Sequence, residues 1–330
     1  MTGASGMLGR ATARALLDRG DEVTVLQRRP ARLPCREVLG DVSDEEVVRR
    51  AVAGQDAVVH LAAKVDVVGR WADYARVNVE GTRTLVGRCL AAGVGRLVHV
   101  SSPSVAHAGR PLVGARAERA DPRLARGHYA RSKAVAERLA LRADAPGLAV
   151  VAMRPHLVWG PGDTQLVGRI VDRARAGRLP VLGAGSALVD TTYVDNAAAA
   201  LLAAVDACGR VHGEPLVVSN GEPRPVLEVL QRLCRAAGAP PPWLRVPVWA
   251  ARTGGAVVEA AWAVTGRVDT PPMTRFLAEQ LTTAHWFDQR RTRELLGWQP
   301  AVPLEDGFAR LAEWYRRDPA PARDAVLTSR

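Results

Sequence analysis

Residues 2–9 read Thr2-Gly3-Ala4-Ser5-Gly6-Met7-Leu8-Gly9, and helix-forming residues follow as far as Leu17. Glycines at this spacing let the backbone turn tightly and approach a pyrophosphate, which then lies on the N-terminus of the following helix. A loop that merely turns can have the same residues, so the motif alone is a weak signal. It predicts a dinucleotide site whose loop contacts come from Gly3, Ser5, Gly6, Met7 and Gly9.

The N-terminal side of this loop lacks the usual context. A dinucleotide-binding loop follows a buried central strand, but only Met1 and Thr2 stand before Gly3 here. Loss of that strand would leave several backbone groups of its two neighbours unpaired, at about 1–3 kcal/mol each. We therefore expect that the first strand is missing, and that Met1 stands where an internal valine codon was read as a start.

Strand-like and helix-like segments alternate beyond the loop. Four short apolar runs predict strands, at 23–26, 56–60, 97–101 and 148–153. Helical patterns separate them, and one begins with the capping box Ser43-Asp44-Glu45-Glu46. This rhythm predicts an α/β fold of the Rossmann type, in which helices cover both faces of a doubly wound parallel sheet.

The pattern changes after Trp159, where Gly160-Pro161-Gly162 interrupts the chain and a region richer in Pro, Gly and Trp follows. We predict two parts on this basis. The dinucleotide-binding domain comprises 1–158, with 190–218 returning to it; a smaller mixed substrate-binding part comprises 159–189 and 219–317; and 318–330 is a flexible tail.

The residues after the strand at 23–26 predict which dinucleotide binds. An acidic side chain there would bind a ribose 2′-hydroxyl, but the chain has Gln27-Arg28-Arg29. Guanidinium groups suit a 2′-phosphate, although solvated surface arginines would look the same. We expect NADP(H) to be preferred, with NAD(H) as the alternative, with Gln27 and Arg28 beside the ribose and Asp41 beside the adenine.

A second motif carries the chemistry. Tyr129-Ala130-Arg131-Ser132-Lys133 places Tyr129 and Lys133 on one helical face. A nearby ammonium favours the phenolate and lowers the pKa of a phenol from its usual value near 10. Tyr129 would then be a general acid for ketone reduction, or a base for alcohol oxidation. Ser102, at the end of the strand at 97–101, would hydrogen-bond the same substrate oxygen, and Lys133 would also hold the nicotinamide ribose.

Taken together, the motifs resemble the extended short-chain dehydrogenase/reductase family over essentially the whole chain. The resemblance rests on residues 3–9, Asp41, His60-Leu61-Ala62-Ala63, Asn78-Val79-Glu80-Gly81-Thr82, Ser101-Ser102, Tyr129 with Lys133, and Arg154-Pro155. Three further stretches, 154–163, 190–196 and 271–275, look like the 3β-hydroxysteroid dehydrogenase-like branch. Residues 219–225 and 283–288 look most like the 2-alkyl-3-oxoalkanoate reductases of olefin biosynthesis.

The resemblance implies an activity and further site residues. The expected activity is hydride transfer between a nicotinamide and C3 of a bulky hydrophobic 3-oxo or 3-hydroxy substrate, with 2-alkyl-3-oxoalkanoate reduction favoured. The implied additional cofactor contacts are Val42, Leu61, Ala62, Ala63, Asn78, Pro155, His156 and Leu157, beside Tyr129 and Lys133. Ser104, His156 and Arg275 are candidate substrate contacts, although a loop histidine with a local hydrogen bond is the favoured explanation of His156, and a structural ion pair explains Arg275 at least as well. A homodimer formed through the helices near 78–91 and 129–142 is also implied.

Other functions remain open at this point. A 3β-hydroxysteroid or sterol-4-carboxylate 3-dehydrogenase is the alternative enzyme. A non-catalytic NADP(H)-sensing protein is the alternative of another class, but such a protein has no need of Ser102, Tyr129 and Lys133 together. A nucleotide-sugar epimerase is disfavoured because the second half is rich in Trp, Leu and Val and poor in amides and acids that bind sugars.

Composition limits the partners. The formal net charge is +11, but the arginines are spread along the chain and only Lys64 and Lys133 are lysines, so we expect no nucleic-acid partner. The four cysteines show no metal-ligand or disulfide spacing, which predicts no metal site and a reducing compartment. We see no signal peptide and no apolar run long enough to span a bilayer, so we expect a cytoplasmic protein with at most peripheral membrane contact.

Overall fold

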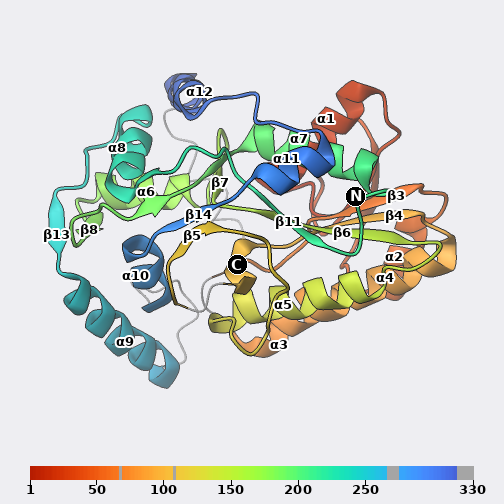
Figure 1. The fold of residues 1–330 in the computed structure, drawn as a ribbon, viewed down its shortest axis with the longest axis horizontal. Helices are drawn as coiled ribbons and strands as arrows, with labels where there is room; N and C mark the ends of the chain where they lie inside the picture. The colour runs from red at the N-terminus through yellow and green to blue at the C-terminus, as the bar shows by residue number, and fades with distance from the viewer. Residues whose placement is uncertain (67–68, 107–108, 266–274, 318–330) are drawn as a thin grey trace.

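The computed structural model describes residues 1–66, 69–106, 109–265 and 275–317, and Figure 1 shows how they are arranged. A parallel sheet forms the right-hand half of that view. The order of its strands is β2 (Arg36–Leu39), β1 (Thr24–Gln27), β3 (Ala57–His60), β4 (Arg96–Val100), β6 (Ala149–Pro155) and β11 (Pro215–Val218). The predicted Rossmann-type fold is confirmed.

Helices cover both faces of this sheet (Figure 1). On one face lie α2 (Glu45–Val52), α4 (Gly81–Ala92) and α5 (Gly127–Arg142), and on the other α1 (Met7–Arg19), α7 (Val194–Ala207) and α11 (Arg290–Leu296). Successive residues of a strand point to opposite faces. Leu97 of β4 is accordingly buried with α2 and α4, whereas Val98 is buried with α7.

Thr2 links β1 to β3 in the middle of the sheet. Its N–H donates to the Val59 carbonyl at 3.0 Å, the N–H of Gly3 donates to the Leu26 carbonyl at 3.1 Å, and the carbonyl of Met1 accepts from the N–H of Leu26 at 2.8 Å. The described part of the chain has no strand before β1. Residues 1–3 therefore occupy the carboxyl end of the position expected for the first strand, and they hold the glycine loop there.

The capping box at the start of α2 was assigned to the wrong residue. Asp44, not Ser43, is the N-cap, and its carboxylate accepts from the N–H groups of Glu46 at 3.0 Å and Val47 at 3.2 Å. The hydroxyl of Ser43 donates instead to Asp41 at 2.7 Å. Ser and Asp are equally good N-caps, so two of them in a row leave the choice to tertiary contacts.

The left-hand half of Figure 1 contains most of the later elements. Their bounds are β7 (Val158–Trp159), α6 (Val167–Arg175), β8 (Pro180–Leu182), β9 (Leu188–Val189), β10 (Thr192–Tyr193), β12 (Arg224–Pro225), α8 (Val226–Ala236), β13 (Leu244–Val246), α9 (Val248–Thr265), α10 (Arg275–Thr282), β14 (His285–Phe287) and α12 (Leu304–Arg317). The helices α6, α8 and α12 share one core around Trp159 and Tyr193. α9 and α10 pack on each other on the left side of the view, with α9 below α10. The boundaries proposed between the two parts remain a prediction.

Short elements complete the described chain. They are α3 (Trp71–Tyr74), the π-helix η1 (Ala75–Glu80), the 3₁₀-helix η2 (Pro103–Ala106) and β5 (Leu112–Ala115), which joins β14 in a small mixed sheet with β9 and β12. The expected tail at 318–330 lies outside the described residues. No helix in the described ranges is both long and apolar enough to cross a membrane.

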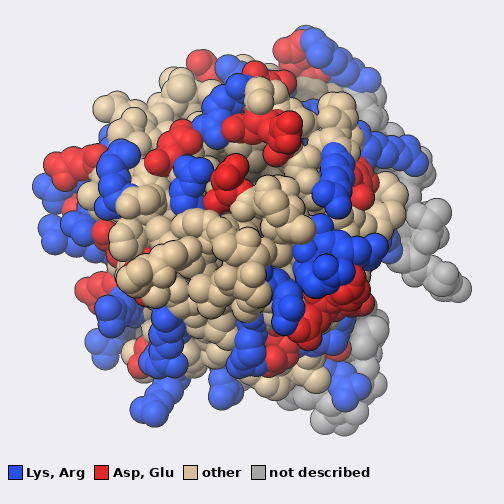
Figure 2. All heavy atoms as spheres, turned by 90° about the vertical axis from the view of Figure 1, so that its right-hand side faces the viewer, with Lys and Arg blue, Asp and Glu red and all other residues tan. Residues whose placement is uncertain are grey.

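The charged side chains of the right-hand face are of both signs (Figure 2). On that face basic and acidic groups alternate around a neutral area, with no continuous basic stripe. Exposed ion pairs such as Arg49–Glu46 on α2 and Arg19–Asp21 illustrate the same mixing. The positive net charge is therefore not concentrated on this face.

Candidate active site

A cavity of about 1620 Å³ lies at the carboxyl ends of the parallel strands. Its wall includes Gln27, Leu61, Ser101 and Pro155, which end or directly follow β1, β3, β4 and β6. Ligands of open α/β sheets bind at this edge. The volume exceeds the roughly 300–1,000 Å³ of ordinary ligand pockets, so the cavity can hold a dinucleotide and a second molecule together.

The glycine loop is built for close approach of a ligand. Gly3 has a φ of 79°, and a Cβ at that position would lie 2.8 Å from the backbone nitrogen of Ala62. A Cβ at Gly9 would lie 2.1 Å from the carbonyl oxygen of Gly3. Neither position therefore accepts a side chain. All five predicted loop residues, Gly3, Ser5, Gly6, Met7 and Gly9, line the cavity.

Two further observations show that the wall fits a dinucleotide. Gly6 is the N-cap of α1 and supplies no side-chain cap, so the first N–H groups of this helix are available to an anion. Gln27 is 5% exposed, and neither atom of its amide has a hydrogen-bond partner among the described residues. A buried amide without partners is costly, and a ribose or adenine at this wall would satisfy it.

The cavity wall includes the four residues predicted to contact the adenosine part of the cofactor: Gln27, Arg28, Asp41 and Val42. Burial raises the pKa of Asp41, but hydrogen bonds from Ser43 and Arg76 outweigh it and lower the pKa to about 2. The guanidinium of Arg76 donates to this carboxylate at 2.8 Å. Asp41 is therefore a fixed hydrogen-bond acceptor at every physiological pH.

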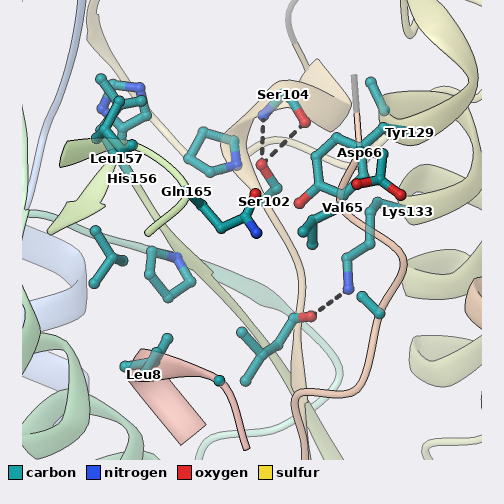
Figure 3. Close-up of a pocket in the computed structure, with 18 of the residues that line it drawn as sticks. Leu8, Val65, Asp66, Ser102, Ser104, Tyr129, Lys133, His156, Leu157 and Gln165 are labelled. Carbon is teal, nitrogen blue, oxygen red and sulfur yellow. Dashed lines mark hydrogen bonds between the residues drawn. The ribbon is translucent and has the colours of Figure 1, made fainter. Parts of the chain in front are cut away.

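All three predicted catalytic residues line the cavity, and two of their side chains face each other. Ser102 follows β4, and Tyr129 and Lys133 lie one helical turn apart on α5. In Figure 3 the side chains of Ser102 and Tyr129 point toward one another. The hydroxyl of Ser102 is 3.0 Å from that of Ser104 and accepts from the N–H of Ser104 at 3.3 Å, so Ser104 holds Ser102 in place.

The expected lowering of the Tyr129 pKa is not found. Burial raises the pKa of Tyr129 above its ordinary value, and only the hydrogen bond with Ser102 lowers it. The expectation failed because Lys133 is turned away, and its ammonium donates to the carbonyl of Val100 at 2.5 Å (Figure 3). A phenol with a raised pKa stays protonated at neutral pH and can donate its proton.

One other predicted residue, Asn78, is placed differently from expectation. Asn78 is buried behind the cavity wall, where its amide accepts from the N–H of Lys64 at 2.7 Å and donates to the hydroxyl of Ser132 at 2.9 Å. It therefore fixes the loop that continues from Ala63 and the helix α5. The side chain of Arg275 lies outside the described part of the structure.

The segment after β6 forms the opposite wall. Pro155, His156 and Leu157 all line the cavity, and the N–H of His156 donates to the Val218 carbonyl at 2.9 Å. The His156 ring contacts the rings of His285 and Phe287 edge-on, at centroid distances of 5.5 and 4.9 Å. Leu157 has a φ of 41°, which is strained for a side chain of this size and is the kind of strain found at binding sites.

Similarity to known proteins agrees with this geometry. Residues 1–219 match the NAD dependent epimerase/dehydratase family. The chain belongs to this family. The predicted membership of the extended short-chain dehydrogenases/reductases is thereby confirmed, and the chain is an enzyme of that class.

Relatives within the family act on different substrates. The chain is 42% identical to a 2-alkyl-3-oxoalkanoate reductase of Stenotrophomonas maltophilia, over 94% of this chain and 97% of the relative. It is 30% identical to a 3β-hydroxysteroid dehydrogenase/decarboxylase of Arabidopsis thaliana, over 83% of this chain and 50% of the relative. The solved structure of MoeE5 with UDP-glucose and NAD superposes with a TM-score of 0.71 at 28% identity, covering 96% of this chain and 97% of MoeE5.

Sequence reasoning missed a large apolar share of the wall. Its residues come from the N-terminus of α1 and from α6 and α8: Leu8, Leu166, Ile170, Val226, Val229, Leu230 and Leu233. The α8 residues recur at helical spacing, but the same spacing is found in any helix that packs on a core. Arg126 and Glu279, which also line the cavity, are 153 residues apart and gave no signal.

We predict that Lys133 titrates far below an ordinary lysine. Burial lowers its pKa to about 8, and Glu137 raises it by a smaller amount. Because the unfolded chain keeps a pKa near 10.5, folding stability should increase between about pH 8 and 10.5, where only the unfolded state binds the proton. The chain has only two lysines, so NMR of protein labelled with ¹³C at lysine Cε shows two signals, and Lys133→Met assigns them. A Lys133 midpoint near 10.5 would contradict the prediction.

Proposed function

We propose that this enzyme reduces 2-alkyl-3-oxoalkanoates to 2-alkyl-3-hydroxyalkanoates with a nicotinamide dinucleotide. One observation carries the proposal: Ser102 and Tyr129 open onto a cavity whose α6 and α8 walls are aliphatic, with Leu166, Ile170 and Leu230 among the lining residues. A substrate with two alkyl branches needs such a wall, whereas a sugar nucleotide needs polar partners. The 42% identical reductase supports the same substrate class.

The polar groups of the site have separate roles in this reaction. The reduced nicotinamide, when bound, supplies a hydride to C3. Tyr129 gives its proton to the C3 oxygen, and Ser102, held by Ser104, donates a hydrogen bond to that oxygen. Lys133 lies 4% exposed in the same wall, and its role in this proposal is to hold the nicotinamide ribose.

NADPH is the proposed reductant. Arg28 is an exposed cation in the cavity wall directly after Gln27, and no acidic side chain takes the position that would bind a ribose 2′-hydroxyl. A guanidinium there favours a 2′-phosphate through charge-assisted hydrogen bonds. NAD(H) remains the alternative, since the MoeE5 structure contains NAD.

The test uses stable 3-hydroxy compounds in the oxidative direction. A 2-alkyl-3-hydroxyalkanoate with NADP⁺ should give NADPH at a kcat/KM at least about tenfold above that of a 3β-hydroxysteroid, because one mismatched pocket contact costs about 1–3 kcal/mol. Repeating the assay with NAD⁺ measures the cofactor preference. Faster turnover of the steroid would support the alternative dehydrogenase, and turnover of neither would overturn the proposed substrate class.

Assembly and location are also proposed. The helices α4 and α5 lie side by side on one face of the sheet, and we propose that they form the interface of a homodimer (Figure 1). All four cysteines are unpaired, which is in accord with a cytoplasmic protein. Trp243 and Trp249 are 71% and 73% exposed near α9, where any contact with a membrane would be peripheral.

A further inference from the structure

An ion pair crosses the cavity beside Tyr129. Arg126 is the N-cap residue of α5, three residues before Tyr129, and Glu279 lies on α10. Nη1 of Arg126 is 2.6 Å from Oε1 of Glu279, and both residues line the cavity. The pair therefore connects the helix that carries the catalytic tyrosine to α10.

The pair is only half satisfied. Oε2 of Glu279 is buried and has no hydrogen-bond partner among the described residues. The other nitrogens of the Arg126 guanidinium donate to no described residue either, so a single contact holds the two groups together. A buried carboxylate oxygen without a partner is costly, whereas a guanidinium binds a carboxylate best through two parallel hydrogen bonds.

The backbone leaves room for this guanidinium. Gly109 has a φ of 77°, and a Cβ there would lie 2.5 Å from Cζ of Arg126. Arg126 is thus seated over a glycine and held from one side by a carboxylate. The position beside the Arg126 guanidinium, now occupied by the Glu279 carboxylate, can therefore accept a carboxylate group.

We propose that Arg126 binds the carboxylate of the substrate, and that Glu279 occupies Arg126 when no substrate is present. This inference rests on the proposed function, because a 2-alkyl-3-oxoalkanoate carries its carboxylate two bonds from the reacting carbon. With the C3 oxygen at Tyr129, that carboxylate lies within reach of a side chain from the preceding turn of the same helix, about 5 Å along its axis. When substrate binds, its carboxylate makes a bidentate contact with the Arg126 guanidinium in place of the single contact from Glu279. The Glu279 carboxylate, including its buried oxygen, is then released from Arg126.

The remaining cations of the wall are less suited to this task. Arg28 lies beside Gln27 at the adenosine end, and Lys133 donates to the Val100 carbonyl. Arg70 lines the cavity and has no ion-pair partner in the described residues, but it is the N-cap residue of α3 and does not lie on α5. It supplies the best comparison for Arg126.

The experiment compares a 2-alkyl-3-hydroxyalkanoate with its methyl ester, using NADP⁺, in wild type and variants. Arg126→Gln is expected to raise KM for the acid by about 10- to 100-fold, the worth of a charged hydrogen bond, and to affect the ester far less. Arg126→Lys, which keeps the charge, is expected to retain part of the preference for the acid. Glu279→Gln is expected to lower KM for the acid by about 2- to 5-fold, because it removes a competing carboxylate from a partly exposed pair.

Two controls separate recognition from folding. Arg70→Gln removes another cation of the same wall, and Arg291→Gln breaks an exposed pair with Glu214 outside the cavity. Neither is expected to change the ratio of acid to ester. The inference is overturned if Arg126→Gln raises KM equally for acid and ester, if Arg70→Gln produces the selective loss, or if Glu279→Gln raises KM as Arg126→Gln does. If the wild-type enzyme oxidises neither compound, the proposed function itself fails.

Discussion

Tyr129→Phe should lower kcat by about 10²- to 10⁴-fold, the usual worth of a positioned proton donor. The variant keeps the ring and loses only the hydroxyl that points toward Ser102 (Figure 3). The pKa of Tyr129 lies above its ordinary value, so the hydroxyl is protonated at neutral pH, as an ordinary tyrosine is, and it is the group positioned beside Ser102 to give a proton to the C3 oxygen. Single-turnover oxidation or reduction measures the loss directly, free of product release.

The matched control is Tyr315→Phe. Tyr315 is buried, at 7% exposed, and lies on α12 outside the cavity wall. The Tyr315→Phe variant should keep the wild-type kcat. Both variants should bind NADPH with the wild-type affinity in a fluorescence titration. Full turnover by Tyr129→Phe would remove the proton-transfer role, and equal losses in both variants would point to a general structural effect.

Local patterns predicted the fold well because they act over a few residues. The glycine spacing at residues 3–9 and the four-residue step from Tyr129 to Lys133 are properties of a loop and one helix, and both lie at the predicted place in the cavity. The strand at 97–101, and Ser102 directly after it, could be predicted from the alternation of strand and helix patterns alone. Each of these features can be read from residues that are close together in the sequence.

Contacts between residues far apart in the sequence explain the side-chain positions that differ from the predictions. The Asn78 side chain lies behind the cavity wall because its amide hydrogen-bonds there to Lys64 and Ser132, which are distant in sequence. Lys133 keeps away from the Tyr129 hydroxyl because the Val100 carbonyl of a neighbouring strand is available to it. Arg126 meets Glu279 across the cavity, 153 residues away. No periodicity or short motif encodes such pairings.

A buried ion pair sets the position of the catalytic helix. Arg154 on β6 is 2% exposed and Glu137 on α5 is fully buried. Arg154 donates to Glu137 through Nε at 2.8 Å and Nη2 at 2.5 Å, and Nη2 also donates to the Glu118 carbonyl at 2.7 Å. These bonds tie α5, one turn beyond Lys133, to the central sheet.

Glu137→Gln is therefore expected to lower the free energy of unfolding by about 3–5 kcal/mol, because it leaves the Arg154 charge buried without its partner. Glu137 also raises the pKa of Lys133, so the same variant should move the Lys133 midpoint below its value of about 8. Denaturant unfolding measures the first effect and the lysine Cε signals measure the second.

Two comparisons make this prediction specific. Arg49→Met breaks an exposed pair with Glu46 on α2, and it should cost no more than about 1 kcal/mol. Combining Glu137→Leu with Arg154→Met removes both charges and should recover much of the stability that either single change loses, since two apolar side chains carry no desolvation cost. If the double variant recovered stability but kcat stayed low, the pair would position Tyr129 and Lys133 as well as stabilise the fold. If Glu137→Gln cost no more than Arg49→Met, the pair would not hold α5 on the sheet, and the backbone contacts of β6 alone would position the catalytic helix.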